Sequence, residues 1–305
     1  MGKKNLSVSQ LLARFRGWIQ AGATLLTNLH LPNFLKGSLY QGAGKTVCVP
    51  GLNCYSCPAA SGACPIGAFQ AVVGSSKFSF SYYITGFLIL LGVLLGRFIC
   101  GFLCPFGWFQ ELLHKIPTKK LSTKKLMPLT YLKYAVLLVM VLLLPAFLVN
   151  DVGMGDPFFC KYLCPQGVLE GAIPLSLANS GIRAALGKLF TWKFSILLSV
   201  IVLSVVFYRP FCKWLCPLGA FYALFNRVSL FQMKVDKSKC VSCGKCARAC
   251  KMDVDVTKTP NHTECIRCGM CIRACPTNAV CFRYGFGDGK EKENAATLRE
   301  NNNKA

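Results

Sequence analysis

Charged residues are scarce in this chain of 305 residues, and so is histidine. Only 15% of the residues are charged, with 12 Asp and Glu against 35 Lys and Arg, and 3 are histidine. With 53% hydrophobic residues, this composition excludes a disordered protein and disfavours an ordinary soluble enzyme. A membrane haem held by two histidines is also disfavoured, because only His30, and not His114 or His262, lies in or near a long apolar run.

Motifs of common catalytic sites are missing too. The chain has no P-loop, no Gly-x-Ser-x-Gly motif and no dinucleotide-binding glycine motif after a strand. We expect no cleavable signal peptide, since the first apolar stretch begins late and has no Ala-x-Ala site. The basic residues are interleaved with long uncharged runs, which disfavours a nucleic-acid binder. Their excess is better explained by membrane orientation.

Four apolar stretches approach the length of about 20 residues that crosses a bilayer. They cover 17–35, 78–96, 126–150 and 194–208, and the last extends back to Leu189. Lys133 is the only charged residue in the third stretch, and polar residues such as Asn28 and His30 weaken the first. A buried helix of a soluble protein is the alternative for any single stretch. Together the stretches predict an α-helical integral membrane bundle of about four spans.

The basic residues are unevenly distributed around these stretches. They are concentrated before the first stretch, between the second and the third, and after the fourth. The positive-inside rule then predicts a multi-pass protein of a bacterial inner membrane, with both termini in the cytoplasm. Four tryptophans lie at or just beyond the predicted span ends, where amphipathic rings are common, and so support the same four-span arrangement. They are Trp18, Trp108, Trp192 and Trp214.

The sequence contains an internal repeat. RFICGFLCPFGWF at 97–109 matches RPFCKWLCPLGAF at 209–221 in Arg, both Cys, Leu, Pro, Gly and Phe. ACPIGAFQA at 63–71 resembles LCPQGVLEG at 163–171. Each half therefore has two spans and two Cys-Pro loops, which predicts two parallel two-span repeats related by an axis along the membrane normal. Equivalent loops of the two halves should then lie on the same membrane face.

The strongest functional signal comes from the 19 cysteines. Near the C-terminus they form the doubled C-x2-C-x2-C-x3-C pattern of a ferredoxin with two [4Fe-4S] clusters, in which the fourth ligand of each cluster comes from the other run. We predict one cluster on Cys240, Cys243, Cys246 and Cys275, and a second on Cys265, Cys268, Cys271 and Cys250. Structural zinc is a weaker alternative, because zinc sites rarely use a C-x2-C-x2-C triplet. Lys251 stands where a proline usually follows the fourth cysteine.

Cys-x3-Cys-Pro occurs three more times. Four-residue spacing puts two thiols on one helical face, and the proline tends to end or redirect the helix. The repeat symmetry predicts that one group of thiols converges on the cytoplasmic face: Cys100, Cys104, Cys212 and Cys216. A second group is predicted to converge on the outer face: Cys57, Cys64, Cys160 and Cys164. Each group can hold a further [4Fe-4S] cluster, and free thiols, outer disulfides or another metal are the alternatives.

Three choices stay open at this point. Cys57 is preferred to Cys54 only because the Cys57-Pro58 step mirrors the other Cys-Pro steps. Clusters on opposite faces are too far apart for direct electron transfer, so either the loops are re-entrant and buried in protein or another carrier lies between them. Quinone is a candidate ligand, and His114 beside Lys115 is its possible contact. The better interpretation of His114 is as an ordinary interfacial residue, and the same holds for Gln110 and Glu111.

The domain organisation follows from these patterns. We predict a first membrane repeat over 1–130, a second over 131–232, a small cytoplasmic α+β two-cluster ferredoxin domain over 233–286, and a disordered tail over 287–305.

The combination of motifs resembles the NapH/NosR-type polyferredoxins, membrane proteins with four or more spans, Cys-x3-Cys-Pro motifs and a C-terminal double ferredoxin. The resemblance covers roughly 32–285 and depends most on GRFICGFLCPFG and RPFCKWLCPLGA. It implies an electron conduit from quinol, or from cytoplasmic donors, toward exported reductases or flavoproteins. The chain departs from the family pattern in its additional outer Cys-x3-Cys-Pro and its CVPGLNCYSCP loop, and it lacks the large exported flavin domain of NosR-like proteins. The resemblance therefore does not imply nitrate or nitrous oxide as the terminal acceptor.

We predict a membrane-bound iron-sulfur electron-transfer protein. Its redox partners would be a cytoplasmic ferredoxin or flavodoxin and an exported reductase or flavoprotein, and as an enzyme it would be a quinol dehydrogenase-like component. The alternative is a metal-reducing or assembly factor for a respiratory metalloenzyme, in which the outer cysteines reduce or hand over a metal. A redox or iron sensor is a third and weaker hypothesis, because the ferredoxin motif is followed by no signalling domain in this sequence.

Overall fold

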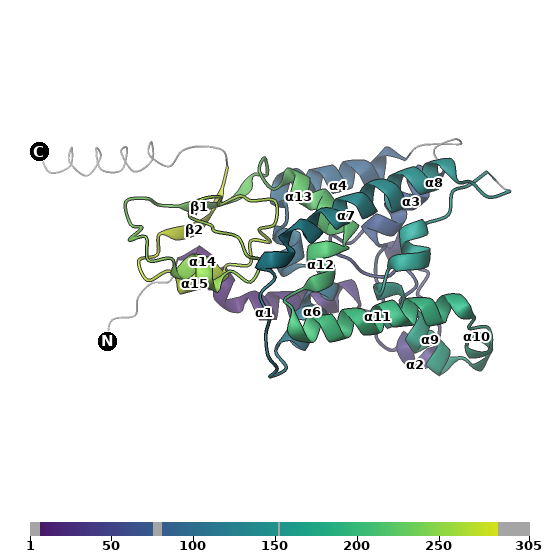
Figure 1. The fold of residues 1–305 in the computed structure, drawn as a ribbon. Coiled ribbons are helices and arrows are strands. Elements are labelled where there is room, and N and C mark those ends of the chain that lie inside the picture. Colours follow the sequence, from purple (N-terminus) through teal and green to yellow (C-terminus); the bar gives the residue numbers. More distant parts are fainter. Residues whose placement is uncertain (1–6, 76–80, 152, 286–305) are drawn as a thin grey trace, which may run out of the picture.

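Figure 1 shows the fold in the computed structural model, which describes residues 7–75, 81–151 and 153–285. The predicted disordered tail at 287–305 lies outside these residues. Most of the described chain is helical, and a small sheet occupies one end of the molecule. There β1 (Phe231–Val235) pairs antiparallel with β2 (Val280–Tyr284), beside α14 (Lys245–Ala249) and α15 (Met270–Ala274). This end, called here the ferredoxin unit, carries the doubled cysteine motif.

Two helices are long and apolar enough to cross a membrane, and they match the third and fourth predicted stretches. The first runs over Lys124–Phe147 and the second is α11 (Lys188–Val206). Only 22% and 17% of their apolar windows are buried, unlike a core helix of a soluble protein. The first run comprises four helical segments: η2 (Lys124–Tyr131), α7 (Leu132–Val136), η3 (Leu137–Leu143) and α8 (Leu144–Phe147).

The first two predicted spans differ from the structure, so a bundle of four spans is not confirmed. The stretch 17–35 is not one helix, since α1 (Val8–Thr27) ends at Asn28 and the short α2 (Asn33–Lys36) follows. α4 (Tyr82–Leu95) covers most of the second stretch. Its 14 residues reach about 21 Å, less than the hydrocarbon thickness of a bilayer.

α1 belongs to the surroundings of the ferredoxin unit. Ser7 and Gln10 form a capping box that starts the helix well before the predicted apolar stretch. The Phe282 N–H in β2 donates to Ser9 Oγ at 3.1 Å, and Ala13 packs so closely on Gly269 that a Cβ there would lie 2.6 Å from the Ala13 Cβ. The N-terminal end of α1 and the ferredoxin unit therefore lie on the same side of the molecule (Figure 1).

Short helices fill the space between the long ones and carry the Cys-Pro loops. In chain order they are η1 (Ala43–Thr46), α3 (Pro65–Gly74), α5 (Phe98–Phe102), α6 (Pro105–His114), η4 (Phe159–Leu163), η5 (Gly167–Ala172), α9 (Ile173–Ala178), α10 (Ser180–Ala184), α12 (Pro210–Trp214) and α13 (Pro217–Phe225). The main apolar core runs through these helices and into the ferredoxin unit, where it includes Met252, Val254 and Ile266.

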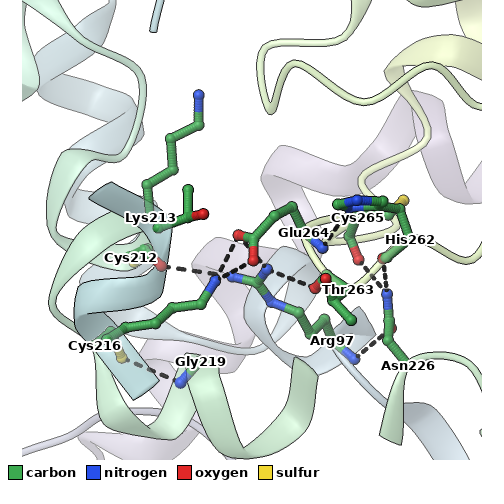
Figure 2. Close-up of polar contacts among 12 residues, drawn as sticks. Arg97, Cys212, Lys213, Cys216, Gly219, Asn226, His262, Thr263, Glu264 and Cys265 are labelled. Atoms are coloured by element: carbon green, nitrogen blue, oxygen red, sulfur yellow. Dashed lines mark hydrogen bonds and ion pairs between the residues drawn. The ribbon is translucent and has the colours of Figure 1, made fainter. Parts of the chain in front are cut away.

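A buried ion trio joins the ferredoxin unit to the helices. Arg97 Nη1 lies 3.0 Å from Glu264 Oε2, and Lys133 Nζ lies 2.5 Å from both carboxylate oxygens. Figure 2 shows the Glu264 carboxylate facing the Arg97 guanidinium, which also donates to the Thr263 carbonyl. All three ionised side chains are almost completely removed from solvent. Lys133, the only charge in the third apolar stretch, is therefore the counter-ion of a ferredoxin-unit carboxylate.

Asn226 adds a second connection on the same side. Its Nδ2 donates to the carbonyls of His262 at 2.6 Å and Cys265 at 3.0 Å, and its Oδ1 accepts the Arg97 N–H (Figure 2). Arg267 donates to the Leu95 carbonyl at 2.9 Å. The loop that carries Cys265 and Cys268 is thus held against the helices by polar groups from both sides.

Replacing Glu264 by Gln should destabilise the protein strongly. The substitution leaves the buried cations of Arg97 and Lys133 without a counter-charge, which costs about 3–5 kcal/mol when one partner of a buried pair is removed. Denaturant unfolding of the detergent-solubilised protein measures this. Asp236→Asn, which breaks the exposed pair of Asp236 with Lys239, is the control and should change stability little. Equal effects of the two substitutions would contradict the role of the ion trio.

Candidate metal-cluster sites

Each of four Cys-Pro steps starts a helix with the same local geometry. Proline disfavours helical backbone in the residue before it, and Cys64, Cys104, Cys164 and Cys216 all have extended ψ angles between 110° and 123°. The proline then takes the first turn of the helix, where its missing N–H is not needed. The thiol is thereby placed beside the free N–H groups at the start of a helix.

A glycine three residues after each of these cysteines donates its N–H to the thiol. The donors are Gly67, Gly107, Gly167 and Gly219, for Cys64, Cys104, Cys164 and Cys216 respectively. The last of these hydrogen bonds measures 3.4 Å. Such N–H groups favour a thiolate over a thiol. The four-fold motif Cys-Pro-x-Gly is present in the sequence, but its role as a sulfur-binding turn becomes clear only from the structure.

The residue six positions after each Cys-Pro cysteine reaches a loop elsewhere in the chain. Gln70 Nε2 lies 3.2 Å from Cys160 Sγ, and Gln110 Nε2 lies 3.1 Å from Cys212 Sγ. Glu170 accepts the Cys54 N–H at 3.0 Å. Gln110 is completely buried and Glu111 largely so, which corrects their interpretation as interfacial residues. His114 is buried as well, against the Ser204 carbonyl.

The structure brings Cys100, Cys104, Cys212 and Cys216 together, and these four are called the inner group. Burial, followed by the neighbouring sulfurs of Cys212 and Cys100, raises the pKa of Cys104 to about 12. Burial and the other three sulfurs raise the pKa of Cys216 well above its usual value. All four thiols lie in buried residues.

Two arginines at equivalent positions of the repeat cross between the halves at the inner group. Arg209 Nη1 donates to the Cys100 carbonyl at 2.5 Å, and Arg97 Nη2 lies 3.5 Å from the Cys212 carbonyl. Both side chains are completely buried. Arg209 is paired with Glu111 at 2.9 Å, as Arg97 is paired with Glu264. The two repeats therefore anchor each other through guanidinium groups.

On the other side of the repeat, Cys54, Cys64, Cys160 and Cys164 line one cavity of about 180 Å³ and are called the outer group. The pKa of Cys160 is raised, first by burial and then by the sulfurs of Cys164, Cys64 and Cys54. Cys57, the cysteine predicted for this group, does not line the cavity but packs next to Cys54. Its thiol is buried beside Ala59 and Ala60 and lies 3.6 Å from Asn28 Oδ1.

The inner and outer groups are connected by two successive backbone N–H groups. The Leu52 N–H donates to the thiol of Cys104, in the inner group, and the Asn53 N–H donates to the thiol of Cys64, in the outer group. Gly51 packs on Cys104 so closely that a Cβ would lie 2.8 Å from the Cys104 Cα. The loop 48–54 is thus a wedge between the groups, and the groups are neighbours rather than a membrane thickness apart.

Tyr222 fixes this wedge from the opposite side. It stands six residues after Cys216, and its completely buried hydroxyl group donates to the Pro50 carbonyl at 3.0 Å. The pKa of the Tyr222 hydroxyl group is raised, first by burial and then by four nearby sulfurs, those of Cys100, Cys104, Cys48 and Cys64. Tyr222 is therefore within electrostatic range of both groups.

In the ferredoxin unit, Cys250, Cys265, Cys268 and Cys271 surround a small apolar cavity next to the helices. Burial, then the sulfur of Cys268 and others of this group, raises the pKa of Cys265 to about 12. Gly101, the neighbour of Cys100, packs on this loop, and a Cβ there would lie 2.3 Å from the Ile266 carbonyl oxygen. This group is therefore adjacent to the inner group.

The remaining predicted group lies farther from the helices. Cys246 and Cys275 belong to one cluster of packed residues, Cys240 is half-buried, and Cys243 is exposed. Although burial opposes it, hydrogen bonds from Thr277 and from the Ala279 N–H lower the pKa of Cys275 below its usual value. Of the cysteines outside the four groups, Cys48 lies in the wedge and Cys281 lies in β2.

The donor sets suit iron-sulfur clusters. All 19 cysteines lie in described residues and none forms a disulfide. Buried thiols with raised pKa values become favourable thiolates when bound metal supplies positive charge, and the backbone N–H groups at the Cys-Pro turns match the hydrogen bonds that tune such clusters. Among the described residues, no group of three His, Cys, Asp or Glu side chains is close enough together to hold a single metal ion. A [4Fe-4S] cluster does not need such a group, because its four thiolate ligands bind different iron atoms and lie farther apart.

Comparisons with known proteins agree with this chemistry. A family model described as a 4Fe-4S binding domain matches 62–82, 79–124, 133–173 and 189–238, which together make up half of the chain. A second model, described as a 4Fe-4S dicluster domain, matches 232–276. No solved structure gives a significant match.

Three relatives illustrate the range of similarity. An uncharacterized protein of Methanocaldococcus jannaschii is 31% identical over 209 residues, which cover 65% of this chain and 77% of that protein. The regulatory protein NosR of Pseudomonas aeruginosa is 27% identical over 168 residues, 52% of this chain and 21% of NosR. The ferredoxin-type protein NapH of Haemophilus influenzae is 27% identical over 150 residues, 36% of this chain and 52% of NapH.

The two glycines of the inner group should respond differently to the same substitution. In Gly107→Ala, the new Cβ lies 2.9 Å from Arg209 Nη1, and Arg209 cannot withdraw because Glu111 and the Cys100 carbonyl hold it. In Gly219→Ala, the nearest atom is 3.5 Å away. We expect Gly107→Ala to lower the free energy of unfolding by about 1–3 kcal/mol. Gly219→Ala is the matched control and should be neutral or slightly stabilising; a reversed order of the two in thermal unfolding would contradict the structure.

Proposed function

This chain belongs to the NapH/NosR-type polyferredoxin family of iron-sulfur electron-transfer proteins, and from that premise we propose that it relays electrons through four [4Fe-4S] clusters. The relay would run between a cytoplasmic donor or the quinol pool and an exported reductase or flavoprotein. Single-electron transfer is the chemistry that the clusters supply when bound. The residues of the chain would determine the distances between the clusters, bury the clusters in protein and determine the electrostatic charge around them.

The proposed ligand sets follow the four cysteine groups. The terminal cluster takes Cys240, Cys243, Cys246 and Cys275; the next takes Cys250, Cys265, Cys268 and Cys271; the inner group and the outer group take one cluster each. In the outer set Cys54 replaces the predicted Cys57, because Cys54 lines the cavity with the other three thiols.

The observation that carries the proposal is the continuity of these sites. The exposed Cys243 marks an entry at the far end of the ferredoxin unit. Ile266 then packs on Gly101 beside the inner group, and the consecutive N–H groups of Leu52 and Asn53 connect the inner group to the outer group. At the entry, Cys246 and Cys275 pack in one residue cluster with Cys271 of the next set. Each site is therefore adjacent to the next, so the proposal needs no separate carrier between them.

Membrane insertion is part of the proposal. The apolar windows over Lys124–Phe147 and Lys188–Val206 are only 22% and 17% buried, and their exposed residues include Leu138, Val139 and Val202. Exposed apolar surface on long helices is stable in lipid but not in water. Since α1 begins beside the ferredoxin unit, the N-terminal helix and this unit would share the cytoplasmic side, which the basic residues favour.

The assembly-factor alternative requires thiols of the outer group that are accessible to a partner. A site that hands over a metal needs accessible thiols, whereas Cys64 and Cys164 are buried and Cys54 and Cys160 are half-buried. This burial favours a resident cluster over a transfer site.

Iron content tests the ligand assignment on the full-length chain. The anaerobically purified protein should contain about sixteen iron atoms, four for each cluster. Cys54→Ser should remove about four of them, because it breaks the outer set, while Cys57→Ser, the matched control, should remove none. About eight iron atoms in the unmodified protein would contradict clusters in the inner and outer groups and would move the assembly-factor alternative ahead.

A further inference from the structure

A cavity that the proposed relay does not use lies where α1, α6 and α15 meet. Its volume is about 490 Å³, within the range of small-molecule sites. α1 passes beside both α6 and α15 (Figure 1). The cavity is lined by residues of all three helices, and so lies between the other helices and the ferredoxin unit. Cys268 and Met270 form part of its wall. A molecule in this cavity would therefore touch a residue proposed to ligate a cluster.

A buried donor without a partner faces this cavity. Gln20 on α1 lines it and is only 2% exposed, and its Nε2 makes no hydrogen bond within the described part of the chain. An unsatisfied buried amide donor is costly, typically by about 1–3 kcal/mol. A ligand with an acceptor oxygen or nitrogen would relieve this cost.

The charged groups around the cavity favour an anion. Arg14, Lys115 and Arg273 line it with exposed side chains that make no ion pair among the described residues. Arg16 and Glu111 also line it, but they form an ion pair with each other. The unneutralised charge at the rim is therefore positive.

The rest of the lining favours a planar ring. Trp18 is 78% exposed and Trp108 half-buried, and both contribute to the wall. Exposed indole rings stack well on flat aromatic molecules. The cavity thus combines aromatic faces, three free cations and one buried amide donor next to a proposed cluster ligand.

We propose that this cavity binds a flavin phosphate of the flavin mononucleotide type, which delivers electrons to the cluster of Cys268. The inference depends on the relay proposed above. A [4Fe-4S] cluster accepts one electron at a time, which a flavin can supply and a nicotinamide, a hydride donor, cannot. In the transfer, the anionic reduced flavin is oxidised by one electron and keeps its ring proton, and the cluster is reduced by that electron.

A neutral quinol fits the cavity less well. Its oxidation releases protons, and Glu111 is the carboxylate among the described lining residues. Although burial opposes ionisation, Arg209 and Arg16 hold the pKa of Glu111 at about 2, so this group is a poor proton acceptor. His114, the predicted quinone contact, does not line the cavity.

Equilibrium dialysis of flavin mononucleotide against the full-length, cluster-containing protein tests the proposal without measuring activity. The double variant Arg14→Gln with Lys115→Gln should weaken binding about tenfold for each lost charge-assisted contact. Arg227→Gln with Lys258→Gln, which removes the same kinds of charge from exposed positions outside the cavity, is the matched control and should bind as the unmodified protein does. Riboflavin, which lacks the phosphate, should bind more weakly than flavin mononucleotide.

Gln20→Leu separates binding from folding. Because the amide donor has no partner within the described protein, its removal should leave the melting temperature unchanged or raise it, while flavin binding weakens. Three results would overturn the proposal: no binding by the unmodified protein, equal binding of riboflavin and flavin mononucleotide, or equal weakening by the control double variant. Iron content is measured on the same samples, so a failure of the flavin site is distinguished from a failure of the relay.

Discussion

The reciprocal anchoring of two buried arginines is the constraint on which the structure depends. Arg97 and Arg209 occupy equivalent positions of the repeat, and each guanidinium crosses to a carbonyl in the opposite half, that of Cys212 or Cys100. A buried guanidinium is tolerated only when it is paired, and Glu264 and Glu111 provide the partners. The first of these carboxylates comes from the ferredoxin unit. The same interaction therefore aligns the two halves, forms the inner group and holds the ferredoxin unit in place.

Around this anchor, local backbone geometry and hydrogen bonds position the sulfurs. The proline fixes the preceding cysteine in an extended conformation, and the glycine that follows supplies an N–H to its thiol. The residue six positions on, such as Gln70 or Gln110, then holds a cysteine of the other half. The consecutive N–H groups of Leu52 and Asn53 connect the inner and outer groups in the same way. The thiols of each group are thus held by backbone and side-chain contacts from both halves of the repeat.

Much of the site could be predicted from the sequence because its cysteines recur at fixed spacings. The repeat predicted groups that join Cys100 with Cys212 and Cys64 with Cys160, and in the structure the thiols of each pair are neighbours. The choice between Cys54 and Cys57 could not be made, since it depends on Glu170 capturing the Cys54 N–H from 116 residues away. A contact distant in sequence also explains Lys133. In the sequence it only interrupts an apolar run, but in the structure it pairs with Glu264. The first predicted span failed because the apolar pattern of 17–35 ignores the capping box at Ser7, which starts α1 earlier and against the ferredoxin unit. Contacts distant in sequence, and not local patterns, decided each of these points.

The central claim is that the inner and outer groups hold clusters that lie close together, on either side of Leu52 and Asn53. Electron paramagnetic resonance of the fully reduced, full-length protein measures this most directly, because clusters that close interact magnetically. We predict broadened or split signals in the unmodified protein, and simpler signals in Cys54→Ser, which lacks the outer cluster but keeps the inner one. A spectrum of independent, non-interacting clusters in a protein with its full iron content, unchanged by Cys54→Ser, would contradict the account.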